Sequence, residues 1–198
     1  MTADEVTVQW GQVERWLADH APADFATLQA GSSGQEMARL EEGLGFHIHR
    51  NLRSFLGVCG GCLFPVSSMD AGAFFFGYAL LDVDGILATH HELVDMVEEA
   101  VAQGYADSVV GSIADRFWVP IARDVTGDIM FVDHRPGREG NVCAMSFGDP
   151  ESIFLWPSMA LMLDDMLTAL RSGTSLAAFQ DLTPRVHEEK MVQWEIRI

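Results

Sequence analysis

The sequence is short of basic residues. Only 12 of its 198 residues are Lys or Arg, against 29 Asp and Glu, so the formal net charge is −17. A protein that binds nucleic acid or an anionic membrane surface needs a basic face. The composition therefore argues against nucleic acid and membrane as partners. If the partner is charged, we expect it to be a basic protein.

Long hydrophobic runs and a secretion signal are also missing. The longest apolar stretch, residues 71–81, contains two glycines and is much shorter than the ~20 residues of a membrane-spanning helix. The opening residues Met-Thr-Ala-Asp-Glu contain neither the basic nor the apolar segment of a signal peptide. The three cysteines cannot all be paired in disulfides. We therefore expect a cytoplasmic protein.

Complete catalytic motifs are absent from the sequence. It contains no P-loop, no G-x-G-x-x-G dinucleotide fingerprint and no G-x-S-x-G nucleophile elbow. We therefore expect no catalytic residues, no bound metal and no cofactor, and we interpret the protein as a non-enzyme.

Two incomplete motifs leave an enzyme as an alternative. Cys59 and Cys62 form a C-x-x-C, but they follow an expected helix, whereas a redox C-x-x-C begins one. His91 and Asp95 have the spacing of an H-E-x-x-H zinc motif, with Asp in place of the second His. The alternative is a metal- or thiol-dependent enzyme that uses Cys59, Cys62 and His91. The simpler interpretation is a glycine-rich loop and an exposed His–Asp pair on a helix.

Periodicity and turn residues predict an α+β fold. Helices come first, then a mostly antiparallel central sheet with a helical insertion, then a C-terminal helix. Ser33 and Glu36 form a capping box at the start of one helix, Gly45 ends it, and a turn is expected at Asp84-Gly85. The expected helices run to about residue 19 and over 34–44, 52–56, 86–103 and 158–170, and the expected strands over 73–83, 117–122, 128–132, 141–147 and 191–198.

The order of several short segments matches a known family. These segments are residues 38–45, residues 52–56 with Gly60-Gly61, residues 78–81, residues 117–122 and residues 127–142. On these residues the chain resembles the SUKH superfamily, which includes the fungal cell-wall assembly regulator and many bacterial toxin-immunity proteins. The resemblance implies a single SUKH-like domain over residues 1–198, with a core at about 8–172 and a C-terminal extension at 174–198. It assigns structural roles to Trp118, Pro120, Gly127 and Asp128.

The acidic residues are concentrated in one part of the chain. Between Ser54 and Asp115 there is no Lys or Arg, and the stretch carries nine acids. On the helix expected over 86–103, an acidic face made by three residues lies opposite three apolar residues. The acidic face consists of Glu92, Asp95 and Glu99, and the apolar face of Leu93, Val97 and Val101.

This acidic face has two interpretations. It can be a solvated surface that aids solubility, or a surface that steers and docks a basic partner. For the second interpretation, the candidate partner-binding residues are Asp82, Asp84, Glu92, Asp95 and Glu99.

Charge and resemblance together give the leading hypothesis. The chain is interpreted as a non-catalytic protein-binding domain, an immunity protein that neutralises a basic, nuclease-type toxin by occlusion. One alternative is an intracellular adaptor or regulator of cell-wall assembly, as in the fungal relatives. The other is the metal- or thiol-dependent enzyme.

Overall fold

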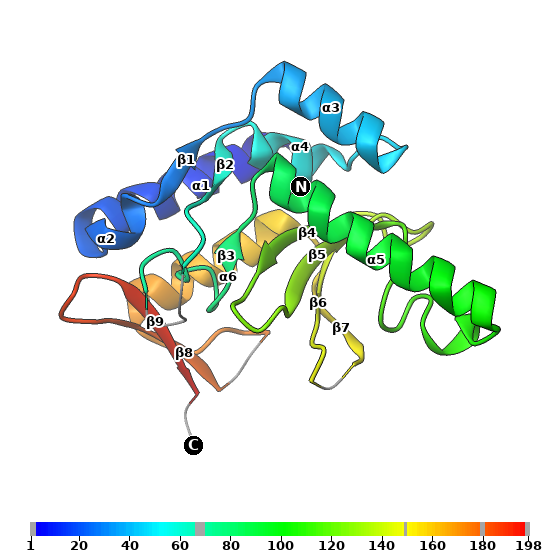
Figure 1. Ribbon diagram of the computed structural model, residues 1–198. Helices are drawn as coiled ribbons and strands as arrows, with labels where there is room; N and C mark the ends of the chain where they lie inside the picture. The colour runs from blue at the N-terminus through cyan, green and yellow to red at the C-terminus, as the bar shows by residue number, and fades with distance from the viewer. Residues whose placement is uncertain (1–2, 66–69, 149, 179–180, 197–198) are drawn as a thin grey trace.

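The structure is a computed structural model that describes residues 3–65, 70–148, 150–178 and 181–196 (Figure 1). Its fold is α+β, as predicted. The helices are α1 (Ala3–His20), α2 (Pro22–Phe25), α3 (Gly34–Leu44), α4 (Arg50–Leu56), α5 (Val83–Gln103) and α6 (Met159–Ser172), with the 3-10 helix η1 at Ala106–Ser108. The strands are β1 (Leu28–Ala30), β2 (Cys59–Cys62), β3 (Ala79–Leu80), β4 (Trp118–Arg123), β5 (Ile129–Asp133), β6 (Asn141–Met145), β7 (Ser152–Trp156), β8 (Leu182–Val186) and β9 (Val192–Ile196).

The central sheet has the strand order β3-β4-β5-β6-β7 and is antiparallel throughout. Alternate side chains point to opposite faces. Met130 and Val132 belong to a core shared with α1, α4 and α6, whereas Ile129 and Phe131 belong to a second core shared with α5. The sheet therefore has helices on both faces, and Figure 1 shows α5 and α6 on opposite sides of it.

Locally determined features follow the prediction. Ser33 Oγ accepts a hydrogen bond from the Glu36 backbone N–H, and the Glu36 carboxylate accepts one from the Ser33 backbone N–H. At the other end of α3, Gly45 adopts the left-handed conformation with φ +78° that glycine tolerates best. These two signals place both ends of α3 correctly.

The strand predicted over residues 73–83 is wrong for most of its length. Only Ala79–Leu80 form a strand, and Phe74 to Phe76 lie in a tight turn although their rings are buried. Phe76 has a φ of +59° and its ring packs on Trp156, with a centroid distance of 5.2 Å. Tertiary packing, and not the strand propensity of three aromatic residues, decides this segment. The turn predicted at Asp84-Gly85 is instead the first turn of α5.

Four strands, β1, β2, β7 and β8, were not expected. The C-x-x-C segment is strand β2, which pairs with β1, and not a loop. Strand β7 forms the last strand of the central sheet. Strand β8 pairs with β9, the strand predicted over 191–198, of which residues 197–198 lie outside the described part.

The C-terminal extension forms a separate β8–β9 hairpin outside the central sheet. The fully buried Asp24 carboxylate accepts hydrogen bonds from the backbone N–H groups of Val192, at 2.6 Å, and Gly72, at 2.9 Å. The indole N–H of Trp194 donates to the Phe74 carbonyl at 2.7 Å. The hairpin is thus tied to α2 and to the aromatic turn before β3.

Candidate protein-binding surface

The acids in the N-terminal half of α5 have partners within the chain. The Asp82 carboxylate is the N-cap and accepts a hydrogen bond from the Gly85 backbone N–H at 2.7 Å. Asp84 forms an ion pair with Arg39 of α3 at 2.5 Å. About two turns further on, Glu92 pairs with Arg123 of β4 at 3.0 Å. Three of the five predicted partner-binding residues therefore have a counterpart within the chain.

The acids in the C-terminal half of α5 differ in that they lack ion-pair partners among the described residues. Asp95, Glu98 and Glu99 are exposed, and among the residues that the structure describes no Lys, Arg or His forms an ion pair with any of them. Glu99 accepts only a hydrogen bond from the Gln103 side-chain amide, at 2.8 Å. Glu98 was not in the predicted set, although its position three residues after Asp95 places it beside that residue on a helix.

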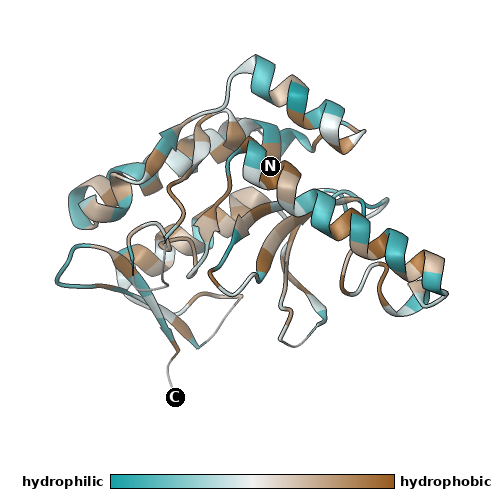
Figure 2. Ribbon diagram, in the orientation of Figure 1, coloured by the Kyte–Doolittle hydropathy of each residue, from teal (hydrophilic) through white to brown (hydrophobic). Residues whose placement is uncertain are grey.

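Apolar side chains are exposed next to these carboxylates. The expectation that Val101 lies on the inward face of the helix is wrong, because Ala100 takes the buried position at that level and Val101 is 61% exposed. Tyr105 and Val110, which follow the end of α5, are each 42% exposed. Figure 2 shows the mixture of hydrophilic and hydrophobic residues along α5. We call the group Asp95, Glu98, Glu99, Val101, Tyr105 and Val110 the α5 patch.

The four residues assigned structural roles lie in the sheet and its turns. Trp118 is fully buried and stacks on Phe131, with ring centroids 4.0 Å apart. Pro120 is in the middle of the sheet, where a register shift between β4 and β5 accommodates a residue without an N–H. In the β4–β5 turn, Gly127 has a φ of +102°, and the Asp128 carboxylate accepts the Phe147 backbone N–H at 2.9 Å. All four therefore lie in the sheet or in the β4–β5 turn.

A buried ion-pair network lies at the end of β5. Asp133 has no exposed area, and two of its oxygens accept hydrogen bonds from the Arg135 guanidinium, at 3.0 and 2.6 Å. The same guanidinium lies 3.7 Å from Asp115 and over the Trp118 ring, 5.3 Å from its centroid. Such a paired, bidentate arrangement satisfies the buried charges. Sequence analysis did not identify this network.

The two cysteines of the C-x-x-C are packed in the interior. Burial raises the pKa of the Cys59 thiol to about 12 and that of Cys62 to about 11. A reactive thiol needs a lowered pKa. Both thiols are therefore held in the neutral, unreactive form at neutral pH.

Three histidines, His49, His90 and His134, are buried or half-buried, and the rings of His90 and His134 lie beside that of Phe46, with centroid distances of 6.4 and 5.4 Å. Backbone groups bind both ring nitrogens of His134, whereas His90 Nδ1 is buried with no hydrogen-bond partner in the described part of the chain. His134 Nδ1–H donates to the Val132 carbonyl at 3.0 Å, and its Nε2 accepts the His49 backbone N–H at 2.8 Å. His90 Nε2–H donates to the Arg116 carbonyl at 2.8 Å. Desolvation by burial lowers the pKa of all three imidazoles. The neutral ring of His134 thus acts as a bridge between β5 and the start of α4.

No metal-binding arrangement of three or more His, Cys, Asp or Glu occurs in the described ranges. His91 and Asp95, the remnant of the zinc motif, are both exposed on α5. Within the same ranges, no helix has the length and apolar character needed to cross a membrane.

The fold and this surface define a class: an α+β domain with helices on both sides of an antiparallel sheet and an exposed acidic helix on one of them. The sequence profile of the SMI1 / KNR4 family (SUKH-1) matches residues 31–165, more than half of the chain. The chain belongs to this family. The match begins just before α3 and ends within α6, so α1, α2 and the β8–β9 hairpin lie outside it. A search of curated proteins found no match. Membership of the family fits a non-catalytic protein-binding or immunity domain with a protein partner.

Proposed function

We propose that this protein is a non-catalytic, cytoplasmic immunity protein that binds a basic, nuclease-type toxin through the α5 patch and neutralises it by occlusion. The binding residues are Asp95 and Glu99 from the predicted set, with Glu98 added. Asp82, Asp84 and Glu92 hold the helix in place.

One observation carries the proposal: three carboxylates without a described counter-ion lie at the C-terminal end of α5, near exposed apolar side chains of that end and of the segment that follows it. Like charges three or four residues apart destabilise a helix by about 0.2–0.5 kcal/mol per pair. A bound basic partner neutralises these carboxylates and so removes the repulsion between them. Before binding, the negative charge of the carboxylates attracts the basic partner, which raises the association rate. Val101, Tyr105 and Val110 then supply apolar area, at about 25 cal/mol per Å² buried, that slows dissociation. Charge and apolar area thus serve different stages of binding.

The functional test uses the genes that adjoin this one. We expect expression of a neighbouring toxin gene to arrest growth, and co-expression of this chain to restore it. The Asp95→Lys/Glu98→Lys variant should restore growth poorly. A matched variant, Asp164→Lys/Glu188→Lys, makes the same charge change at exposed acids outside the patch and should restore growth fully.

The physical test is the association rate of the purified toxin with each variant. Reversal at Asp95 and Glu98 should slow association at least about tenfold at low salt, while the control should stay within about twofold of the wild type. Equal slowing by both variants would show that net charge alone matters and would refute the α5 patch as the binding site. An isolated locus with no neighbouring toxin would contradict the immunity function and favour the adaptor.

A further inference from the structure

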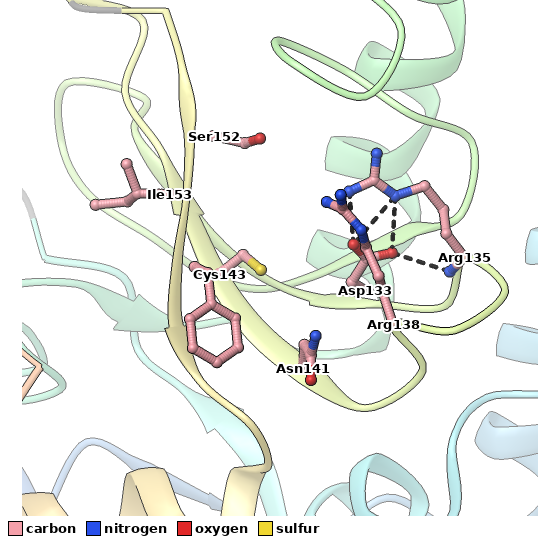
Figure 3. Close-up of a pocket in the computed structure, with 8 residues that line it drawn as sticks. Asp133, Arg135, Arg138, Asn141, Cys143, Ser152 and Ile153 are labelled. Carbon is pink, nitrogen blue, oxygen red and sulfur yellow. Dashed lines mark hydrogen bonds and ion pairs between the residues drawn. The ribbon is translucent and has the colours of Figure 1, made fainter.

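A cavity of about 310 Å³ opens over β6 and β7, on the same side of the sheet as α5 (Figure 3). Asn141 and Cys143 of β6 face it from alternate positions, and Phe154 of β7 pairs with Cys143 in the sheet. Arg135 and Arg138, from the β5–β6 turn, line the opposite side. The cavity therefore has an apolar wall that includes Cys143 and Phe154 and a polar wall of guanidinium, amide and hydroxyl groups, together with the Asp133 carboxylate that is paired with Arg135.

Part of the polar wall presents hydrogen-bond donors that no residue in the described part of the chain accepts. Arg135 is committed to Asp133, as the dashed lines in Figure 3 show. Arg138 differs: no carboxylate in the described part of the chain forms an ion pair with it. The Asn141 side chain likewise makes no hydrogen bond with any described residue. A free guanidinium beside an amide suits a carboxylate, which accepts two parallel hydrogen bonds from Arg.

The neighbouring surface is apolar and exposed. Phe154 is 59% exposed and Ile153, which also lines the cavity, is 46% exposed. Strand β7 is the last strand of the sheet. Exposed apolar residues grouped around a charged pocket are typical of a docking surface for another protein.

The cavity adjoins the α5 patch. The Ser152 hydroxyl and the Arg135 guanidinium both donate to the Gly111 carbonyl, each at 3.3 Å, and the Ser152 backbone N–H donates to Ser112. Gly111 directly follows Val110 of the patch. The acids of α5, the apolar residues of the α5 patch and the cavity with its two arginines therefore lie in that order along the surface.

We infer that this cavity receives an Asp or Glu side chain, next to an apolar residue, from the protein that docks on the α5 patch. The identity of that partner rests on the proposed function, but the pocket can be tested without it. The cavity attracts a negative side chain, whereas the α5 patch attracts a basic surface. A partner that places an acidic side chain in the cavity therefore has only one orientation in which its basic surface meets α5.

The test uses two capped peptides, acetyl-Phe-Glu-Val-amide and acetyl-Phe-Gln-Val-amide, titrated into the full-length protein labelled with ¹⁵N. The Glu peptide should shift the amide signals of Asn141, Cys143 and Phe154 in a saturable way. The Gln peptide should bind at least about tenfold more weakly, because it loses a charge-assisted hydrogen bond. Equal binding of the two peptides, or shifts elsewhere on the protein, would overturn the proposal.

Two variants and one small acid complete the design. Arg138→Gln should remove the preference for Glu, while Arg171→Gln, at an exposed arginine of α6, should leave it intact. A preference for Glu that survives Arg138→Gln refutes the pocket. If 3-phenylpropionate binds more tightly than the Glu peptide, the site takes a small carboxylate and the partner side chain is refuted. The Asp95→Lys/Glu98→Lys variant should bind the peptide normally, so failure of the toxin assay and failure of the pocket are distinct results.

Discussion

The two halves of α5 carry similar negative charge in different ways. In the N-terminal half, Asp82 caps the helix and Asp84 and Glu92 pair with cations of α3 and β4. In the C-terminal half, three acids face solvent without a described counter-ion, beside exposed apolar side chains. In the proposed function, the first half carries acids that already have partners within the chain, and the second half carries the acids that are open to a protein partner. The distribution of counter-ions, and not the number of acids, distinguishes the two halves.

The largest expected loss of stability comes from removing an acid that is wholly buried, Asp133, in contrast to the exposed acids of α5. Replacing Asp133 by Ala leaves the Arg135 guanidinium without its bidentate partner in a buried site. We expect a loss of about 3 kcal/mol in the free energy of unfolding, measured by urea denaturation. Asp95→Ala is the matched exposed control and should change stability by less than about 0.5 kcal/mol. A cost at Asp133 no larger than at Asp95 would contradict the role of the ion-pair network.

The next effect compares the helix cap with the free acids. Asp82→Ala removes the acceptor of the Gly85 N–H and should destabilise the protein by about 1 kcal/mol. Glu98→Ala removes one member of a like-charge cluster and should leave stability unchanged or slightly higher. Thermal or urea unfolding of both variants checks this difference. Equal destabilisation would mean that the two halves of α5 do not differ as described.

The smallest effect concerns pH, and it should act through three buried or half-buried histidines and not through the acidic face of α5. Burial lowers the pKa of His49, His90 and His134 in the folded protein. Below pH ~6.5 the unfolded chain then binds more protons than the folded one. Stability is therefore complete above that pH and should fall as pH drops from 7.5 to 5.5.

A pair of variants tests whether the buried histidines cause the dependence of stability on pH. His134→Gln should reduce the dependence of the unfolding free energy on pH between 7.5 and 5.5. His20→Gln, at an exposed position, should leave it as in the wild type. Stability that rises on acidification would contradict the neutral His134 bridge.

Features set by neighbouring residues could be predicted from the sequence. The Ser33–Glu36 box and Gly45 mark α3 because every group involved lies within the helix or one turn of it. Strand β2 was missed because its partner, Leu28–Ala30, lies far earlier in the chain and the segment itself is rich in glycine. Strand β7 was missed because its Ile153 and Phe154 are exposed, so the strand lacks a clear alternation.

The candidate surface was predictable only as a set of charges. The nine acids between Ser54 and Asp115 were evident, but their counter-ions were not. Arg39 lies 45 residues before Asp84, and Arg123 lies 31 residues after Glu92. Only the folded chain brings these pairs together, and so only the structure separates the anchoring acids from the free ones.

The most direct test of this account is the salt dependence of association with the proposed toxin partner for two charge-neutralised variants. Asp84→Asn/Glu92→Gln and Asp95→Asn/Glu98→Gln remove the same charge from the two halves of α5. The account predicts that the second variant reduces the slope of the association rate against ionic strength clearly more than the first. Equal slopes, or a larger reduction in the first variant, would contradict it.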